Sequence, residues 1–266
     1  METVTTTDGT TIAFDQLGTG TPLVLVSGAA CDRAVDSRLA DGLAAHFTVL
    51  NYDRRGRGDS TDTPPYAVER EIEDLEIMLA AAGGSAVVVG LSSGAVLAAH
   101  AAAAGLPISH LVMWEPPFRL DAESQQAARQ YAEKTRALLA EGRRGDALEL
   151  FMTVVGMPAE AIAGMRQSPY WSLGEALAPT LAYDAAVMGD GRLPTERLAA
   201  IRTPTAVLAG GGSPDWFRAT GRATAAAIPG AAYHELPGQT HDVDPGALTA
   251  AVRELAGTRR SYAGQP

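Results

Sequence analysis

Residues 87–96 read Val-Val-Val-Gly-Leu-Ser-Ser-Gly-Ala-Val, an apolar strand that runs directly into a helix through the pattern G-x-S-x-G. So sharp a turn strains the backbone of its central serine, and the residues two positions on either side must be small for strand and helix to approach. Ser92 stands at that central position, between Gly90 and Gly94. The stretch therefore predicts that Ser92 projects as a nucleophile from the carboxyl end of a strand. A plain tight turn with a capping serine is the alternative.

Apolar runs of the same kind recur along the chain, at residues 23–26, 47–52, 108–114, 205–208 and 233–236. Continuous apolar runs are typical of parallel strands that are buried on both faces. Helical patterns lie between the runs, and Asp8-Gly9 predicts a hairpin near the start. The alternation of strand and helix predicts a mostly parallel sheet flanked by helices on both faces.

The alternation breaks between residues 118 and 198, where three helical patterns follow one another with no strand among them. We expect this segment to form a helical cap over a core domain made of residues 1–117 and 199–266. Extra helices packed on the flank of the sheet are the alternative. Further on, Asp244-Pro245 predicts the N-cap and first residue of a last helix, and the tail from Thr258 is expected to fray.

Composition limits the possible partners. The 266 residues are 46% hydrophobic and 20% charged, which is typical of a soluble globular protein, and the net charge of −10 disfavours nucleic acid and anionic membranes. Cys31 is the single cysteine, which fits a reducing compartment. The start has no signal-peptide pattern, and no apolar stretch approaches the ~20 residues of a membrane span. We expect a cytoplasmic monomer or homodimer that binds a small molecule.

Five histidines compete for the role of a base that would activate the serine. His46 and His110 precede strands, so they lie at the wrong end of a parallel sheet. His100 falls within the helix after the serine turn, and His234 within the last strand. His241 follows that strand by a short loop, at the edge where the serine projects, and imidazole exchanges protons near neutral pH. His241 is the predicted base, and an ordinary loop histidine is the alternative.

Two positions compete for the acid that would orient this histidine. Glu115 directly follows the strand at 108–114, and Pro116-Pro117 behind it stiffen the backbone. Asp215 follows the next strand along the chain, behind a proline. We favour Glu115 on geometry and keep Asp215 as the alternative acid. Asp242 and Asp244 are too close to the histidine in sequence to orient it easily.

Together these features resemble the α/β-hydrolase family over most of the chain. Residues 51–60, Asn-Tyr-Asp-Arg-Arg-Gly-Arg-Gly-Asp-Ser, are similar to the family's turn after its fourth strand, which is usually structural. Many members carry their acid shortly after the next-to-last strand, where Ser213 stands here. Glu115 instead resembles the arrangement in zearalenone lactonases, which pair a G-x-S-S-G-A turn, matched by residues 90–95, with a glutamate just past the strand after the nucleophile helix.

The resemblance also implies an oxyanion hole. Residues 27–31, Ser-Gly-Ala-Ala-Cys, follow the run at 23–26, where the family usually has His-Gly. The resemblance assigns one donor to the amide of Ala29, with Gly28 beside it, and the other to the amide of Ser93. Cys31 is expected to line the entrance of the cleft as a packed thiol rather than a nucleophile, because no base is placed for it.

Four aromatic side chains lie on segments that can face this cleft, namely Trp114, Phe118, Trp171 and Trp216. They would favour an apolar substrate, although each is equally compatible with a place in the core. No cluster of histidine, cysteine and carboxylate residues has the spacing of a metal site, so neither a metal nor a cofactor is expected.

We therefore expect a serine hydrolase that cleaves a carboxylic ester or lactone of a small, largely apolar substrate through an acyl-serine. Ser92, His241 and Glu115 would form its catalytic triad. Two alternatives stay open, because a fold does not determine a function. The same residues could act on a C–C bond or as a lyase, or the protein could be a catalytically weak ligand-binding receptor.

Overall fold

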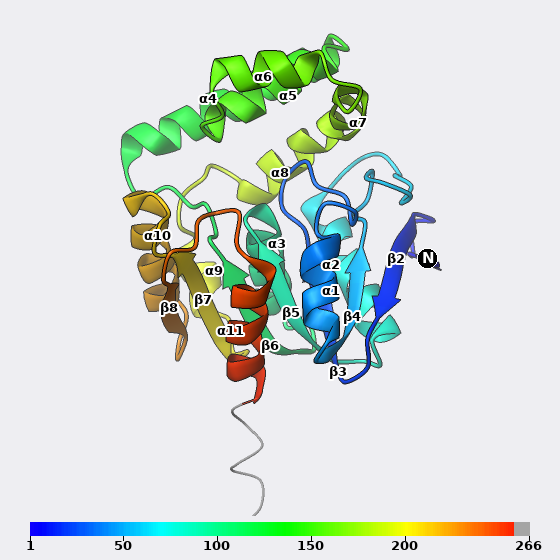
Figure 1. Cartoon of the computed structure of the whole chain (residues 1–266), viewed down its shortest axis with the longest axis vertical. Helices are drawn as coiled ribbons and strands as arrows, with labels where there is room; N and C mark the ends of the chain where they lie inside the picture. The colour runs from blue at the N-terminus through cyan, green and yellow to red at the C-terminus, as the bar shows by residue number, and fades with distance from the viewer. Residues whose placement is uncertain (258–266) are drawn as a thin grey trace, which may run out of the picture.

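The computed structural model describes residues 1–257 of the chain, which form one eight-stranded sheet in the order β1-β2-β4-β3-β5-β6-β7-β8 (Figure 1). The strands are β1 (Glu2–Thr5), β2 (Thr11–Leu17), β3 (Thr21–Val26), β4 (Phe47–Tyr52), β5 (Ala86–Leu91), β6 (Ile108–Trp114), β7 (Thr205–Gly210) and β8 (Ala232–Leu236). β1 and β2 form the predicted antiparallel hairpin, and β2 also pairs antiparallel with β4. All further neighbours in the sheet, from β4 and β3 through to β7 and β8, pair in parallel. The predicted fold class is confirmed.

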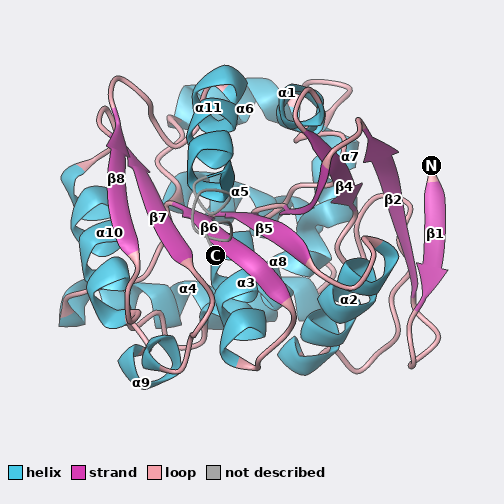
Figure 2. Ribbon diagram, turned by 90° about the horizontal axis from the view of Figure 1, so that it is seen from below, coloured by secondary structure: helices cyan, strands magenta, loops and turns pink. Residues whose placement is uncertain are grey.

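Side chains of the central strands alternate between two apolar cores. In β3, Val24 and Val26 belong to one core, while Leu23 and Leu25 belong to the other. The first core includes side chains of α2 (Val68–Ala81), α3 (Ser93–Ala103) and α10 (Asp215–Ala227). The second includes those of α1 (Ser37–Ala44) and α11 (Pro245–Gly257). Figure 2 shows α1 and α11 on one side of the sheet and α2 and α3 on the other.

The strand order reverses at the middle of the sheet. β3 has β4 on one side and β5 on the other, and the chain passes from β5 to β6 on the side away from β3. At such a reversal, the loops that leave neighbouring strands diverge and leave a crevice at their carboxyl ends, where ligands bind in open α/β sheets. Residues 27–36, after β3, and the turn at Ser92, after β5, both leave the sheet there.

A set of helices is inserted between β6 and β7. They are α4 (Ala122–Ala140), α5 (Arg144–Val154), α6 (Ala159–Arg166), α7 (Trp171–Leu177), a 3₁₀ turn (Ala178–Thr180), α8 (Leu181–Met188) and α9 (Thr195–Ala199). In Figure 1, α4 to α7 arch above the sheet, and α8 lies beneath them against the rest of the molecule. The three helical patterns expected here are present as α4, α5 and α6.

The inserted helices divide between two cores. Leu148, Ile162 and Trp171 form a small core within the arch, so α5 to α7 stabilise one another. Val187 of α8 and Leu198 of α9 instead pack into the main core below. The expected cap, residues 118–198, therefore includes two helices that pack against the sheet layer.

The last helix begins as predicted, because the side chain of Asp244 accepts a hydrogen bond from the amide of Ala247 at 2.9 Å. The fraying expected from Thr258 falls outside the described residues. Among residues 1–257, no helix is both long and apolar enough to cross a membrane.

Candidate active site

The turn between β5 and α3 has the strained geometry that its sequence predicts. Ser92 has φ of +53° and ψ of −119°, a conformation that residues other than glycine rarely adopt. A Cβ atom added at Gly90 would lie 2.5 Å from the Cα of Ala95, and one at Gly94 would collide with the backbone oxygens of Val26 and Ser27. Only glycine fits these two positions, and the close approach of strand and helix leaves Ser92 at the carboxyl end of the sheet.

Glu115 and His241 meet at the same edge of the sheet. Nδ1 of His241 lies 2.7 Å from Oε2 of Glu115, and the Gly210 amide donates to Oε1 at 2.8 Å. Glu115 is fully buried and has φ of +44°. This strained backbone conformation, directly after β6, directs the glutamate side chain toward the imidazole of His241. Both carboxylate oxygens are engaged, and the histidine presents its Nδ1 side to the acid.

Burial alone would raise the pKa of the Glu115 carboxyl, but hydrogen bonds with His241, Ser213 and the Gly210 amide outweigh it and hold the pKa below its usual value. Glu115 is therefore ionised at neutral pH. A carboxylate at Nδ1 favours the tautomer that carries a proton on that nitrogen, and it stabilises the imidazolium that forms when Nε2 takes up a proton.

Trp114 connects the serine turn to the histidine loop. Its carbonyl accepts a hydrogen bond from the amide of Ser92 at 2.9 Å, and its indole N–H donates to the carbonyl of His241 at 3.0 Å. The next residue in the chain, Glu115, contacts the imidazole. The end of β6 thus positions nucleophile, base and acid relative to one another.

A stack of rings lies against the histidine, whose side chain is 46% accessible to solvent. The imidazole of His241 stacks on Phe217, with 4.7 Å between ring centroids and 17° between planes. Trp216 also stacks on Phe217, with 3.7 Å between ring centroids, and the guanidinium of Arg119 lies 4.3 Å from the Trp216 ring centroid. Sequence reasoning missed Phe217, because a single aromatic residue in a helix carries no signal of such a stack.

Asp215, the alternative acid, lies elsewhere. It is the first residue of α10, its side chain is 95% exposed, and it pairs with Arg218 one turn along the helix. Proline at position 214 starts the helix and turns Asp215 toward solvent. Of the two candidates, Glu115 is the carboxylate that hydrogen-bonds His241.

The other histidines lie away from the serine, and His110 stands within the first half of β6 rather than before it. Nδ1 of His100 accepts from Arg197 at 2.8 Å, and Nε2 lies 2.9 Å from the carbonyl of Val187. His100 therefore connects α3 to α8 and α9 within the fold. His46 and His234 are exposed, at the start of β4 and within β8.

The loop after β3 lies against the nucleophile. A Cβ atom added at Gly28 would be 3.3 Å from the Cβ of Ser92, so a larger residue there would crowd the serine. Ala29 is half-buried, and Ala30 takes the left-handed conformation with φ of +53°. Ser93, the next residue after the serine, begins α3, where helix amides carry partial positive charge. Of the two expected oxyanion donors, Ser93 directly follows Ser92 in the chain, and Ala29 directly follows Gly28, which lies against the serine.

Cys31 packs within this loop. Its thiol lies 3.3 Å from the carbonyl of Ala29, and burial, with Asp36 nearby, raises the pKa of the thiol to about 12. The thiol is protonated at neutral pH and is a poor nucleophile. Its expected place at the cleft entrance is compatible with its partial exposure.

Three of the four aromatic residues expected to contact substrate are core residues instead. Trp114 and Phe118 are each 1% exposed, and Trp171 is 8% exposed in the small core of the arch. These expectations were wrong because large rings at the ends of buried strands and between short helices remove more apolar surface from water than a cleft wall does. Trp216, which is 38% exposed, remains available to a ligand.

The turn at residues 51–60 is structural, as the family resemblance implies. Asp53 is fully buried and accepts from the amide of Asp59 and from both the amide and the guanidinium of Arg33. Arg54, Arg55 and Arg57 are each 1% exposed. Sequence reasoning did not identify the partners of these three arginines.

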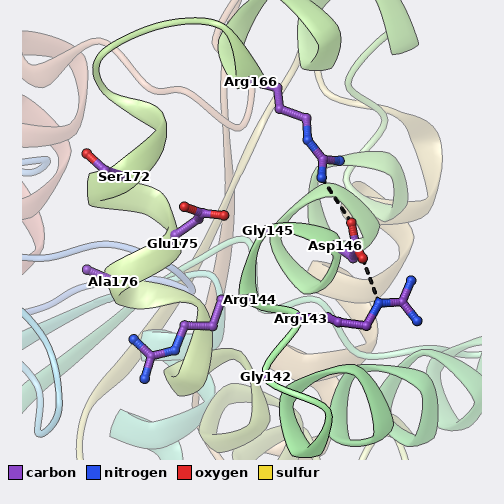
Figure 3. Close-up of a pocket in the computed structure, with 9 residues that line it drawn as sticks. All are labelled: Gly142, Arg143, Arg144, Gly145, Asp146, Arg166, Ser172, Glu175 and Ala176. Carbon is purple, nitrogen blue, oxygen red and sulfur yellow. Dashed lines mark hydrogen bonds and ion pairs between the residues drawn. The ribbon is translucent and has the colours of Figure 1, made fainter.

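A separate hollow lies within the arch, between the start of α5 and helices α6 and α7 (Figure 3). Its volume is about 500 Å³, and charged side chains such as Arg143, Asp146 and Arg166 surround it. Asp146 pairs with both of these arginines, as the dashed lines in Figure 3 show. Within residues 1–257, no group of three or more histidine, cysteine or acidic residues is arranged to bind a metal ion.

Comparisons with known proteins agree with this geometry. The family model described as "Alpha/beta hydrolase family" matches residues 23–253. An alpha/beta hydrolase from Sphaerobacter thermophilus is 52% identical, with a TM-score of 0.87 over 96% of this chain and 99% of that chain. A hydrolase from Pseudomonas aeruginosa is 27% identical, with a TM-score of 0.77 over 96% and 98% of the two chains. A thermophilic esterase from Thermogutta terrifontis is also 27% identical, with a TM-score of 0.72 over 97% and 98%. The chain belongs to the alpha/beta hydrolase family.

Proposed function

We propose that this protein is a serine hydrolase that cleaves a carboxylic ester or lactone of a small, largely apolar molecule. The observation that carries the proposal is the hydrogen bond between His241 and the buried, ionised Glu115, at the edge where the strained backbone projects Ser92. A nucleophile, a base and a group that orients the base are the three parts that acyl transfer needs.

The proposed reaction begins when Nε2 of His241 takes the proton of the Ser92 hydroxyl. The serine oxygen attacks the carbonyl carbon, and the amides of Ala29 and Ser93 donate to the oxyanion of the tetrahedral intermediate. The imidazolium then gives its proton to the leaving alcohol, which leaves an acyl-serine. Water, deprotonated by the same imidazole, attacks the acyl-serine and releases the acid and the free serine.

The related esterase from Thermogutta terrifontis supports ester chemistry for this chain. The place of Glu115, directly after β6, supports the narrower resemblance to zearalenone lactonases, and hence a lactone as one form of the ester. The partly exposed Trp216, stacked toward the histidine through Phe217, favours apolar groups in the substrate. Net charge and the single protonated cysteine fit a cytoplasmic monomer or homodimer with no nucleic-acid or membrane partner.

The test compares turnover of p-nitrophenyl acetate and butyrate by the wild type, Ser92→Ala and Ser37→Ala. Ser37 is an exposed serine at the start of α1 and serves as the matched control. We expect Ser92→Ala to lose at least about 10³-fold in kcat and Ser37→Ala to match the wild type. Equal turnover by Ser92→Ala would contradict the proposal. If the wild type cleaved a β-diketone and none of the esters, the same residues would instead catalyse cleavage of a C–C bond.

A further inference from the structure

A buried carboxylate from the inserted helices reaches the serine turn. Asp184, on α8, accepts a hydrogen bond from the hydroxyl of Ser93 at 2.8 Å. Arg54 donates to the same carboxylate at 2.8 Å, and Arg57 donates to both of its oxygens at 2.9 Å. Arg54 also forms a two-bond pair with Glu71. We call these four charged residues, Arg54, Arg57, Glu71 and Asp184, the buried ion network.

The two arginines extend from this network to the loop that carries the other oxyanion donor. Arg57 donates to the carbonyls of Gly28 at 2.5 Å and Cys31 at 3.1 Å, and Arg54 to the carbonyl of Ser27 at 3.3 Å. The carbonyl of Gly28 and the amide of Ala29 belong to one planar trans peptide unit, so they point in opposite directions. By binding the carbonyl, Arg57 determines the direction of the Ala29 N–H.

Stability alone gives little reason for such a network. Its four members are each at most 5% exposed, and desolvating charges costs about as much as their mutual attraction returns. Burial would raise the pKa of Asp184, but Arg57 and Arg54 hold it below the usual value, so the carboxylate is ionised at neutral pH. Apolar replacements of buried ion networks are often neutral or stabilising, which leaves a positional role as the better explanation.

Residues on either side of Asp184 hold helix α8 against neighbouring elements. The neighbouring Tyr183 donates to Asp62 at 2.5 Å and stacks on Tyr66, with 3.9 Å between ring centroids. One turn further along, the carbonyl of Val187 lies 2.9 Å from His100 of α3. The contacts on both sides of Asp184 attach α8 to the main body of the protein, while Leu181 at its start packs into the small core of the arch.

We propose that Asp184 and Arg57 are positioning residues that set the direction of both oxyanion donors, Ser93 and Ala29, from the base of the inserted helices. This inference rests on the proposed function, because it assumes that these two amides receive the oxyanion. Asp184 fixes the first residue of α3 through its hydroxyl, and Arg57 fixes the peptide between Gly28 and Ala29. A shift of α8 would therefore change the oxyanion hole on both of its sides.

The chain offers a matched control in the next arginine. Arg55 is as deeply buried as Arg57 and forms a two-bond pair with Asp74 at 2.7 Å to each oxygen. Its other bonds go to Asp8 and to the carbonyl of Arg70, away from the loop after β3. Asp74→Asn removes a buried carboxylate of the same kind and leaves both oxyanion donors in place.

The test measures the reaction of a fluorophosphonate with the wild type, Asp184→Asn, Ser93→Ala and Asp74→Asn. A fit against reagent concentration separates the binding constant from the rate of phosphonylation. We expect Asp184→Asn to be phosphonylated at least about tenfold more slowly than the wild type, with a binding constant within about twofold. Loss of a whole oxyanion donor lowers the rate of acyl transfer by about 10²- to 10³-fold. Ser93→Ala, which leaves both ion pairs of Asp184 intact, should slow several-fold, and Asp74→Asn should match the wild type.

The outcomes separate the two proposals. If all variants react at the wild-type rate, or if Asp74→Asn slows as much as Asp184→Asn, the positioning role is overturned while the serine hydrolase stands. If the wild type itself does not react, the proposed function fails and the positioning role fails with it. Should Asp184→Asn not fold, Ser93→Ala against Asp74→Asn decides alone: an unchanged rate for Ser93→Ala overturns the inference.

Discussion

Three residues at the end of β6 and β5 account for the arrangement of the candidate site. Glu115 comes directly after β6 and adopts φ of +44°, while Ser92 comes directly after β5 and adopts φ of +53°. Backbone strain of this kind costs about 1–3 kcal/mol per residue and persists where the surroundings enforce it. Trp114 holds this backbone in place, because its carbonyl accepts from the amide of Ser92 and its indole N–H donates to the carbonyl of His241.

Exchange of the acid tests this arrangement at the residue scale. Glu115→Gln keeps the size of the side chain but removes the negative charge that favours the reactive tautomer and the imidazolium of His241. We expect kcat for p-nitrophenyl butyrate to fall about 10³- to 10⁴-fold. Asp215→Asn, at the exposed start of α10, should leave kcat unchanged. A loss confined to Asp215→Asn would show that the acid is assigned to the wrong residue.

Sequence reasoning located these side chains because their signals are local. The serine lies in a five-residue pattern, the glutamate directly follows the apolar run of β6, and the histidine follows β8 by a short loop. Asp184 has no such signal, since its contact with Ser93 joins residues 91 positions apart. The aromatic assignments failed for a related reason: the sequence shows a ring on a segment but not which side of the segment faces water.

At the scale of elements, the strands were predictable to within two residues, and the inserted helices were less so. Strands of the central sheet are buried on both faces, which leaves a continuous apolar run in the sequence. Helices α7, α8 and α9 are short and partly exposed, so their apolar positions form no long stripe. α8 is nevertheless the element that contacts the serine turn, through Asp184.

The last helix provides a prediction at this scale. Asp244, three residues after His241, caps α11 by accepting a hydrogen bond from the amide of Ala247. Loss of such a cap costs about 1 kcal/mol. We expect Asp244→Ala to lower the free energy of unfolding by about that amount in urea titrations. The neighbouring exposed Asp242→Ala is the control and should match the wild type. Equal stability of the two variants would show that the cap contributes nothing.

For the whole molecule, the buried ion network predicts a dependence of stability on pH. Burial opposes ionisation of Asp184 and Glu71, yet their arginine partners hold both pKa values below the usual 3.8 and 4.5. A carboxyl whose pKa is lower in the folded state stabilises the fold above its unfolded pKa, and that contribution is lost as pH falls through the folded value. The network therefore contributes fully above about pH 5 and weakens progressively below it.

Comparison of the wild type with Asp184→Asn measures this contribution. At pH 7 the variant should be less stable by about 3–5 kcal/mol, because two buried arginines lose a partner. Between about pH 5 and pH 3 the free energy of unfolding should fall less steeply in the variant than in the wild type. Asp74, whose pKa burial raises to about 6, acts in the opposite direction in both proteins, so it cancels in the comparison. Parallel pH curves would contradict the role of Asp184 in acid stability.

We propose Ser92 as the nucleophile of this member of the alpha/beta hydrolase family. The most direct measurement is peptide mapping by mass spectrometry after treatment of the full chain with a fluorophosphonate, with Ser92→Ala treated alongside. We expect a single phosphonyl group on Ser92 of the wild type and none on the variant. An unlabelled wild type, or a label on Ser93 or Cys31, would contradict it.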